Sequence, residues 1–93
     1  MLPRRVKISD RAFFQELDKE TVILDMAEEQ YWGLDDVGAR MWQALADHGD
    51  DMQVVVATLR TVYDVDEAVL INDLAELIER LRAAGLVTVE PPA

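Results

Sequence analysis

The stretch that decides the fold is QYWGLDDVGARMW, residues 30–42. Its first five residues predict a short aromatic strand that runs directly into a helix, which begins near Asp36 with an aspartate cap. Gly33 stands inside this strand, where glycine weakens pairing unless something must approach the backbone closely. The stretch therefore predicts the edge of a sheet that receives another chain.

Alternation along this strand assigns its two faces. Leu34 leads into the helix and is expected to be buried, so Gln30 and Trp32 share its face. Tyr31 and Gly33 then point to the opposite face. Each face carries one aromatic side chain, and these aromatics either belong to the core or serve a partner.

The composition describes one folded domain. A chain of 93 residues is near the common domain size, and its 51% hydrophobic content is enough for a modest core. The sequence shows no internal repeat and no low-complexity segment. We expect a single domain over residues 1–93, with its core at about residues 12–89.

The charge restricts the partners, and the apolar runs restrict the compartment. With 19 acidic and 9 basic residues the formal net charge is −10, a field that repels nucleic acid and anionic membranes. A cationic or neutral partner is favoured. The N-terminal MLPRRVKISD contains no apolar segment of signal-peptide length, and no run approaches the roughly 20 residues of a membrane span. The expected compartment is the cytoplasm.

The sequence lacks the groups that catalysis would need. It holds no cysteine, which excludes a disulfide, a thiolate metal site and a cysteine nucleophile. The one histidine, His48, falls at a helix end, and the one serine, Ser9, has no Ser-His-Asp arrangement around it. Acidic pairs stand at turns and helix starts, where capping explains them. We predict that the protein is not an enzyme and carries no cofactor and no metal.

Short strands are predicted before the first helix. Residues 21–26, TVILDM, are β-branched and alternate, and residues 30–34 pair back onto them across a turn at 27–29. Residues 12–17, AFFQEL, form a further short apolar run, which completes a small antiparallel meander. Residues 4–9 form an extended arm or a short strand.

Two helices follow, marked by caps and apolar spacing. Either member of the pair 35–36 caps the first helix, and either member of the pair 50–51 caps the second, which extends to about Tyr63. Gly49, after the first helix, is placed for a left-handed turn. The positions expected to face the core are Val37, Met41, Trp42 and Leu45 in the first helix and Val55, Leu59 and Val62 in the second.

A third and longest helix is predicted from Asp66 to about Ala84, with Gly85 closing it and residues 86–89 forming a final short strand. The helix carries two apolar stripes, which cover a wider face than a small core usually needs. Either one stripe is left for a partner, or the helix is central to a small bundle. The stripes are Leu70, Leu74, Leu77 and Leu81, and Ile71, Ala75 and Ile78.

In their order and separation these segments resemble the PqqD-like family of recognition domains, which bind the leaders of ribosomally made, post-translationally modified peptides. The resemblance covers about residues 12–89 and is carried by VILDMAEEQYWGLDDVGARMWQAL, by LRTVYDV and by DLAELIERLRAAGLV. Within the family, the tryptophan of GARMW and the lack of a fused protease or cyclase domain favour the stand-alone recognition protein of lasso peptide biosynthesis. The chain also resembles the chaperone of pyrroloquinoline quinone synthesis, although Asp47-His48-Gly49 replaces the Cys-Asp-Gly turn of that branch.

The resemblance implies an α+β, winged-helix-like fold, with a three-stranded antiparallel sheet followed by three helices. It also implies that a leader adds as a strand to the third strand, in a groove against the third helix. The implied partners are the precursor leader peptide and a separate leader peptidase. The implied peptide-binding residues are Gln30, Tyr31, Trp32, Gly33 and Leu34 on the strand edge, and Asp73, Leu74, Leu77 and Leu81 on the helix.

Other functions remain open at this point. One keeps the fold but makes the chain a peptide chaperone for a radical enzyme of quinone cofactor synthesis. Another is a winged-helix transcription regulator, which the charge disfavours because the third helix is rich in acidic residues where a DNA reader needs basic ones. A small enzyme subunit with an acidic site would need a bound metal or measurable turnover.

Overall fold

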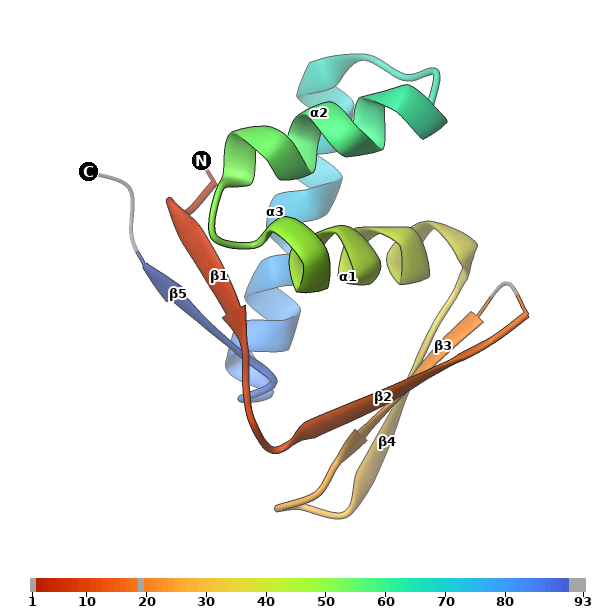
Figure 1. The fold of residues 1–93 in the computed structure, drawn as a ribbon, viewed down its shortest axis with the longest axis vertical. Helices are drawn as coiled ribbons and strands as arrows, with labels where there is room; N and C mark the ends of the chain where they lie inside the picture. The colour runs from red at the N-terminus through yellow and green to blue at the C-terminus, as the bar shows by residue number, and fades with distance from the viewer. Residues whose placement is uncertain (1, 19, 91–93) are drawn as a thin grey trace.

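The chain folds into a three-stranded antiparallel sheet followed by three helices, so the predicted α+β, winged-helix-like class is confirmed. The computed structural model describes residues 2–18 and 20–90. Figure 1 shows the helices gathered to one side of the sheet made by β2, β3 and β4. The strands are β1 (Arg5–Ile8), β2 (Ala12–Leu17), β3 (Glu20–Asp25), β4 (Gln30–Leu34) and β5 (Val87–Glu90), and the helices are α1 (Asp36–His48), α2 (Met52–Val62) and α3 (Glu67–Ala83).

The three-stranded sheet has the order β2-β3-β4, with β3 in the centre. Its register pairs Phe14 with Ile23 and Ile23 with Trp32, so these side chains lie on the same face. That face is the inner one, because Ile23 is fully buried.

A second, two-stranded sheet joins the two ends of the described chain, and its pairing was not predicted. β1 and β5 are antiparallel, with Arg5 opposite Glu90 and Ile8 opposite Val87. Residues 5–8 are therefore a strand and not an extended arm. On its other side β1 is held by the turn after α1, since Val6 N donates to Gly49 O at 2.8 Å.

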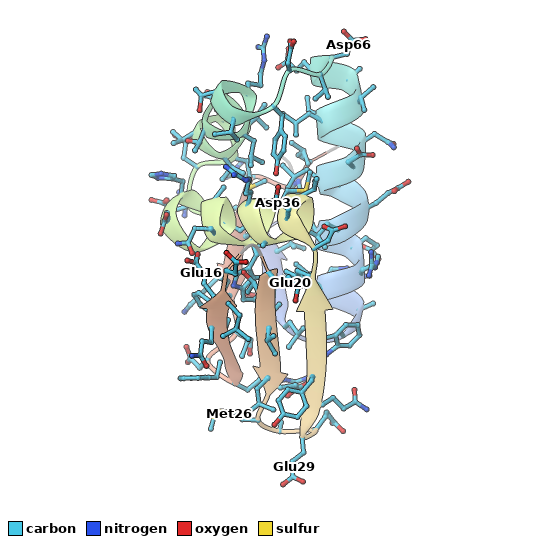
Figure 2. The ribbon with its side chains drawn as sticks, turned by 90° about the vertical axis from the view of Figure 1, so that its right-hand side faces the viewer. Glu16, Glu20, Met26, Glu29, Asp36 and Asp66 are labelled. Atoms are coloured by element: carbon cyan, nitrogen blue, oxygen red, sulfur yellow. The ribbon has the colours of Figure 1, made fainter. Side chains whose placement is uncertain are left out.

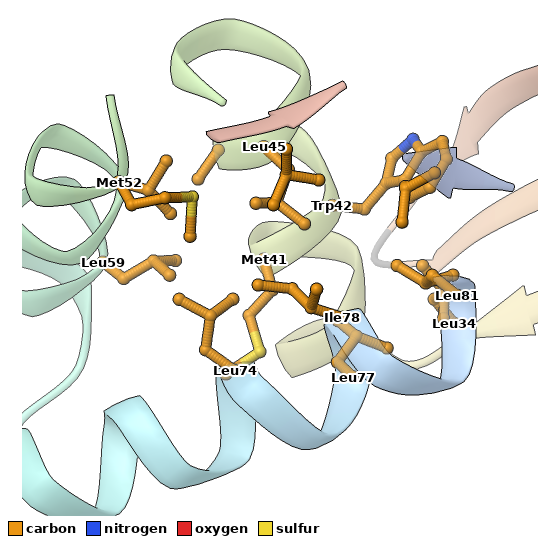
Figure 3. Packing of buried hydrophobic residues seen from close by; sticks show 14 of the residues in the cluster. Leu34, Met41, Trp42, Leu45, Met52, Leu59, Leu74, Leu77, Ile78 and Leu81 are labelled. Carbon is orange, nitrogen blue, oxygen red and sulfur yellow. The ribbon is translucent and has the colours of Figure 1, made fainter. Parts of the chain in front are cut away.

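The core lies between the helices and the inner face of the sheet, as Figure 3 shows. Trp42 has no exposed surface, and its ring meets Phe14 edge-to-face, with 5.3 Å between the ring centroids. Both apolar stripes of α3 face the core. The stripe that includes Leu74 is buried, and in the other stripe Ile78 is 3% exposed while Ile71 and Ala75 are half-buried. Of the two readings of α3, the structure favours the central helix.

Aspartates cap the helices largely as predicted. Asp35, and not Asp36, caps α1 by accepting from Gly38 N at 2.9 Å. Asp51, and not Asp50, caps α2 by accepting from Gln53 N at 3.0 Å. Asp66 occupies the cap position of α3, but its side chain makes no capping hydrogen bond.

Two valines predicted to face the core are exposed. Val37 is 44% exposed because it lies in the first turn of α1, before the helix reaches the core. Val62 is 50% exposed because α2 ends there, and the next residue, Tyr63, packs against the core instead. Among the described residues, no helix is both long enough and apolar enough to cross a membrane.

The prediction of a left-handed turn at Gly49 is wrong. Gly49 has a φ of −61°, which any residue adopts. Glycine is needed there for space, since a Cβ atom would overlap the carbonyl oxygens of Val6 and Leu45. Gly85, by contrast, has a φ of 78°, in the left-handed region expected where a helix is closed by glycine.

Replacing Gly49 with alanine is therefore expected to lower the free energy of unfolding by about 1–3 kcal/mol, the usual cost of forcing extra atoms into a packed site. The measurement is urea unfolding. Gly33→Ala is the matched control, because a Cβ at Gly33 meets no atom within 4 Å, and its effect should stay within about 0.5 kcal/mol. Equal effects of the two substitutions would contradict this account of Gly49.

Candidate functional site

β4 is an edge strand. It pairs with β3 on one side, and no other described strand pairs with its outer side. An uncovered edge presents unpaired N–H and C=O groups to which a further strand can add. The edge inferred from QYWGL is therefore open in the structure.

The hydrogen-bond ladder determines which backbone groups of β4 stay free. In an antiparallel sheet, residues that bond one neighbouring strand alternate with residues that bond the other. Met26 N donates to Arg11 O at 3.0 Å, one step beyond the Ala12–Asp25 pair, so the even-numbered residues of β3 bond β2 and the odd-numbered ones bond β4. By the register of β3 and β4, the N–H and C=O groups of Tyr31 and Gly33 lie in the plane of the sheet and point away from β3, toward the open side of β4.

The other edge of the sheet, along β2, is also unpaired by any described strand, but its surroundings differ. In Figure 2, α3 stands on the β4 side of the sheet. Leu34, at the end of β4, belongs to the same buried cluster as Leu77 and Leu81 of α3, and Figure 3 shows these side chains together. Of the two edges, as far as the described residues go, the β4 edge alone has a helix beside it.

The edge residues lie as alternation predicted. Tyr31 is 74% exposed and Leu34 only 8% exposed. Trp32 is half-buried against the core, and its indole Nε1–H is buried without a hydrogen-bond partner. Gln30 and Gly33 are exposed. The two aromatics thus divide, with Trp32 turned inward and Tyr31 open to solvent.

The helix-side residues do not lie together on one surface. Leu74, Leu77 and Leu81 are 0%, 7% and 3% exposed, so their side chains are engaged in the core. Asp73 is exposed. Leu77 and Leu81 share the buried cluster that contains Leu34 of β4, whereas Asp73 takes no part in that cluster.

The outer face of the sheet carries an apolar row that the sequence reasoning did not assign. Phe13, Leu24 and Tyr31 are cross-strand neighbours, and Phe13 is 59% exposed. Met26, at the end of the same face, is 61% exposed. The alternation that placed Tyr31 opposite Leu34 was the available signal, had it been extended to β2 and β3.

A partly buried ion pair between Arg11 and Asp25 was also missed. The two side chains approach to 3.3 Å, and Asp25 is 1% exposed. The signal was Asp25 itself, a charged residue on the same strand face as Ile23. A carboxylate buried in a small core needs a partner.

The titratable groups with shifted pKa values lie outside β4. Burial raises the pKa of Tyr63 at the end of α2, and the nearby Arg40 partly opposes that rise. The hydrogen bond from Arg82 lowers the pKa of Glu79 on the exposed face of α3.

A surface hollow of about 640 Å³ lies between residues 2–4, α2 and α3, and β4 does not line it. In the described part of the chain, no three His, Cys, Asp or Glu side chains gather as a metal site.

Together these features define a small winged-helix-like domain whose open strand edge lies beside its last helix. Residues 20–87 match the family described as "Coenzyme PQQ synthesis protein D (PqqD)". The chain belongs to the PqqD family, which confirms the resemblance inferred from the sequence. Domains of this family are non-catalytic, so the prediction that the chain is not an enzyme is also confirmed.

Two solved structures are similar over most of their length. One is described as "TbiB1 in Complex with the TbiA(beta) Leader Peptide"; it is 32% identical, covers 87% of this chain and 93% of that chain, and has a TM-score of 0.80. The other is "Lasso peptide synthetase B1 complexed with the leader peptide", 26% identical over 90% of this chain and 98% of that chain, with a TM-score of 0.78. Among curated proteins, no sequence matches significantly.

The burial of the helix-side residues predicts their effects on stability. Leu77→Ala is expected to lower the free energy of unfolding by about 2–5 kcal/mol, because it leaves a cavity in the core. Asp73→Ala, on the exposed side of the same helix, should change it by no more than about 0.5 kcal/mol. Denaturant unfolding monitored by circular dichroism measures both. A stable Leu77→Ala variant would mean that Leu77 is available to a ligand.

Proposed function

We propose that this chain binds the leader segment of a lasso precursor peptide as a strand added to β4, and presents it to a separate leader peptidase. The observation that carries the proposal is the open edge of β4, with the backbone groups of Tyr31 and Gly33 directed outward. Two similar structures whose descriptions name a bound leader peptide support it.

The backbone supplies the affinity in this mode. Tyr31 and Gly33 each offer one outward N–H donor and one outward C=O acceptor. Gly33 has no side chain to hinder an approaching strand, and nothing within its own fold requires glycine there, since a Cβ would meet open space. Strand addition obtains its selectivity from pockets for alternate side chains. The half-buried Trp32 and Leu34, beside α3, are the edge residues placed to form them.

The domain makes and breaks no bonds in this proposal. Holding the leader raises the effective concentration of the precursor near the peptidase, which then cleaves it. The exposed row of Phe13, Leu24 and Tyr31 offers an apolar surface for that second protein, next to the edge on which the leader would lie. We place this step in the cytoplasm.

The alternative is a peptide chaperone for a radical enzyme of quinone cofactor synthesis, which the name of the matching family favours. The two pathways differ in the peptide bound. Fluorescence anisotropy of labelled leaders from lasso and quinone-cofactor precursors, titrated with this protein, separates them. Tight binding of the lasso leader alone supports our proposal, preference for the cofactor precursor supports the alternative, and binding of neither removes both.

Gly33→Pro tests strand addition at β4. Proline removes the outward N–H of residue 33 while leaving the ladder with β3 intact, so leader affinity should fall by at least about tenfold. Gly33→Ala keeps the N–H and adds only a Cβ on the side of the approaching strand, so it should lose clearly less affinity than Gly33→Pro.

A second control distinguishes the two edges of the sheet. Glu16→Pro removes an outward N–H from β2, on the opposite edge, and should leave leader affinity unchanged. Anisotropy titrations measure affinity, and circular dichroism confirms that each variant is folded. Loss of binding in Glu16→Pro, with Gly33→Pro unaffected, would place the leader on β2.

Phe13→Glu tests the outer face. The charge should leave leader affinity unchanged, because Phe13 is remote from the outward groups of β4, and should slow peptidase cleavage of the leader-bound precursor several-fold by disrupting an apolar contact. Cleavage is followed by mass spectrometry at saturating precursor. Val62→Glu makes the same change at an exposed valine on α2, and with this variant the peptidase should cleave the precursor at the normal rate. Equal cleavage rates with the two variants would exclude the outer face of the sheet as the surface that contacts the peptidase.

A further inference from the structure

A single arginine links the end of β3, opposite the first residue of β4, to the end of α3. Arg11 precedes β2, and its Nη2 donates to Asp25 Oδ2 at 3.3 Å and to the carbonyl oxygen of Ala84 at 3.1 Å. Asp25 is the last residue of β3, and Ala84 is the C-cap of α3. Among the described residues, no other side-chain hydrogen bond or ion pair connects α3 with the three-stranded sheet.

The carboxylate that Arg11 contacts also shapes the turn into β4. Asp25 Oδ1 accepts from Ala27 N at 3.0 Å and from Glu28 N at 3.3 Å. Asp25 is the cross-strand partner of Gln30, the first residue of β4. Because Asp25 is 1% exposed, its charge depends on these few partners for compensation. By holding the Asp25 carboxylate, Arg11 therefore also helps to fix the turn from which β4 begins.

The end of α3 is built to receive the guanidinium. Gly85 has a φ of 78°, and a Cβ atom on it would overlap Nη2 of Arg11. A side chain at residue 85 would therefore displace the arginine. The carbonyl of Ala84 lies at the negative end of the helix dipole, where a cation is stabilised. Conformation, space and charge all favour Arg11 at this place.

β4 is thus connected to α3 near both of its ends, through its own residue Leu34 at one end and through its cross-strand partner Asp25 at the other. At one end, Leu34 packs in the core with Leu77 and Leu81. At the other, the bridge from Asp25 through Arg11 to Ala84 makes the connection. Between these two attachments lie the outward backbone groups of Tyr31 and Gly33.

We propose that Arg11 is a positioning residue of the leader-binding edge: its bridge between Asp25 and Ala84 sets the separation of β4 from α3 before the leader arrives. The inference rests on the proposed function. A preset separation lowers the ordering cost that binding must otherwise meet. Without the bridge, the beginning of β4 moves relative to α3, and part of the binding free energy is spent on restoring the arrangement.

Arg11→Gln and Arg11→Lys test this role. Glutamine retains a donor for Ala84 but loses the ion pair with Asp25, and should weaken binding of a labelled lasso leader by on the order of tenfold. Lysine keeps the charge and should restore most of the affinity. Arg60→Gln removes the same charge from an exposed pair with Glu67 on the helical side of the molecule and should bind within about twofold of the unmodified protein.

Amide hydrogen exchange separates positioning from general stability. In Arg11→Gln, exchange should accelerate in residues 26–30 and in the last turn of α3, while the amides of α2 keep their protection. Uniform acceleration along the chain would show a merely structural role and overturn the inference. Unchanged affinity and unchanged exchange would overturn it equally.

The same titrations separate failure of the inference from failure of the proposed function. If the unmodified protein binds no leader, the proposed function is wrong, and the inference falls with it. If it binds and Arg11→Gln binds equally well, only the inference is wrong. Should Arg11→Gln not fold, Arg11→Lys and Asp25→Asn are compared instead. Weaker binding by Asp25→Asn, with local exchange changes, supports the bridge, and unweakened binding by that variant rejects it.

Discussion

The edge-to-face contact between Phe14 and Trp42 is the interaction on which the rest of the structure depends. Phe14 lies in β2 and Trp42 in α1, so the contact joins the sheet to the helices at the centre of the core. Such pairs add about 0.5–1.5 kcal/mol beyond the burial of their surface. Since Leu34 enters the same cluster immediately before α1 begins, β4 is anchored through its inner face while its outer edge remains uncovered.

Local patterns in the sequence predicted the elements because the physics that forms them is local. Aspartate caps and apolar spacing located the helices, and period-two alternation placed Leu34 inside and Tyr31 outside. The failures involve distant segments. The pairing of β1 with β5 joins two four-residue strands from opposite ends of the chain, too short for their composition to specify a partner. The role of Gly49 follows from the approach of β1, which no pattern around residue 49 encodes.

In the candidate site too, the part that depends on local sequence was predictable, and the part that depends on contacts between distant segments was not. The open strand edge could be predicted from QYWGL, because a glycine inside a short aromatic strand is visible in the sequence, and the structure leaves that edge unpaired by any described strand. The helix half of the site could not, since periodicity defines a stripe but not what covers it, and Leu74, Leu77 and Leu81 are covered by the core. The bridge from Arg11 could not be predicted either, because its two partners are distant in sequence: Asp25 lies 14 positions after Arg11, and Ala84 lies 73 positions after it. Only the buried charge of Asp25 hinted that such a partner existed.

An uncovered edge also invites pairing between copies of the chain, and the placement of acids acts against it. Glu28 and Glu29 precede β4, and Asp35 and Asp36 follow it. Two β4 strands pairing antiparallel would bring the acids before one strand near those after the other. Screening confines such repulsion to about 8 Å at physiological ionic strength, so charges at the strand ends matter more than the total of −10. A neutral or cationic strand would meet no such repulsion, so the acids at the two ends of β4 would favour its addition over pairing with a second copy of the chain.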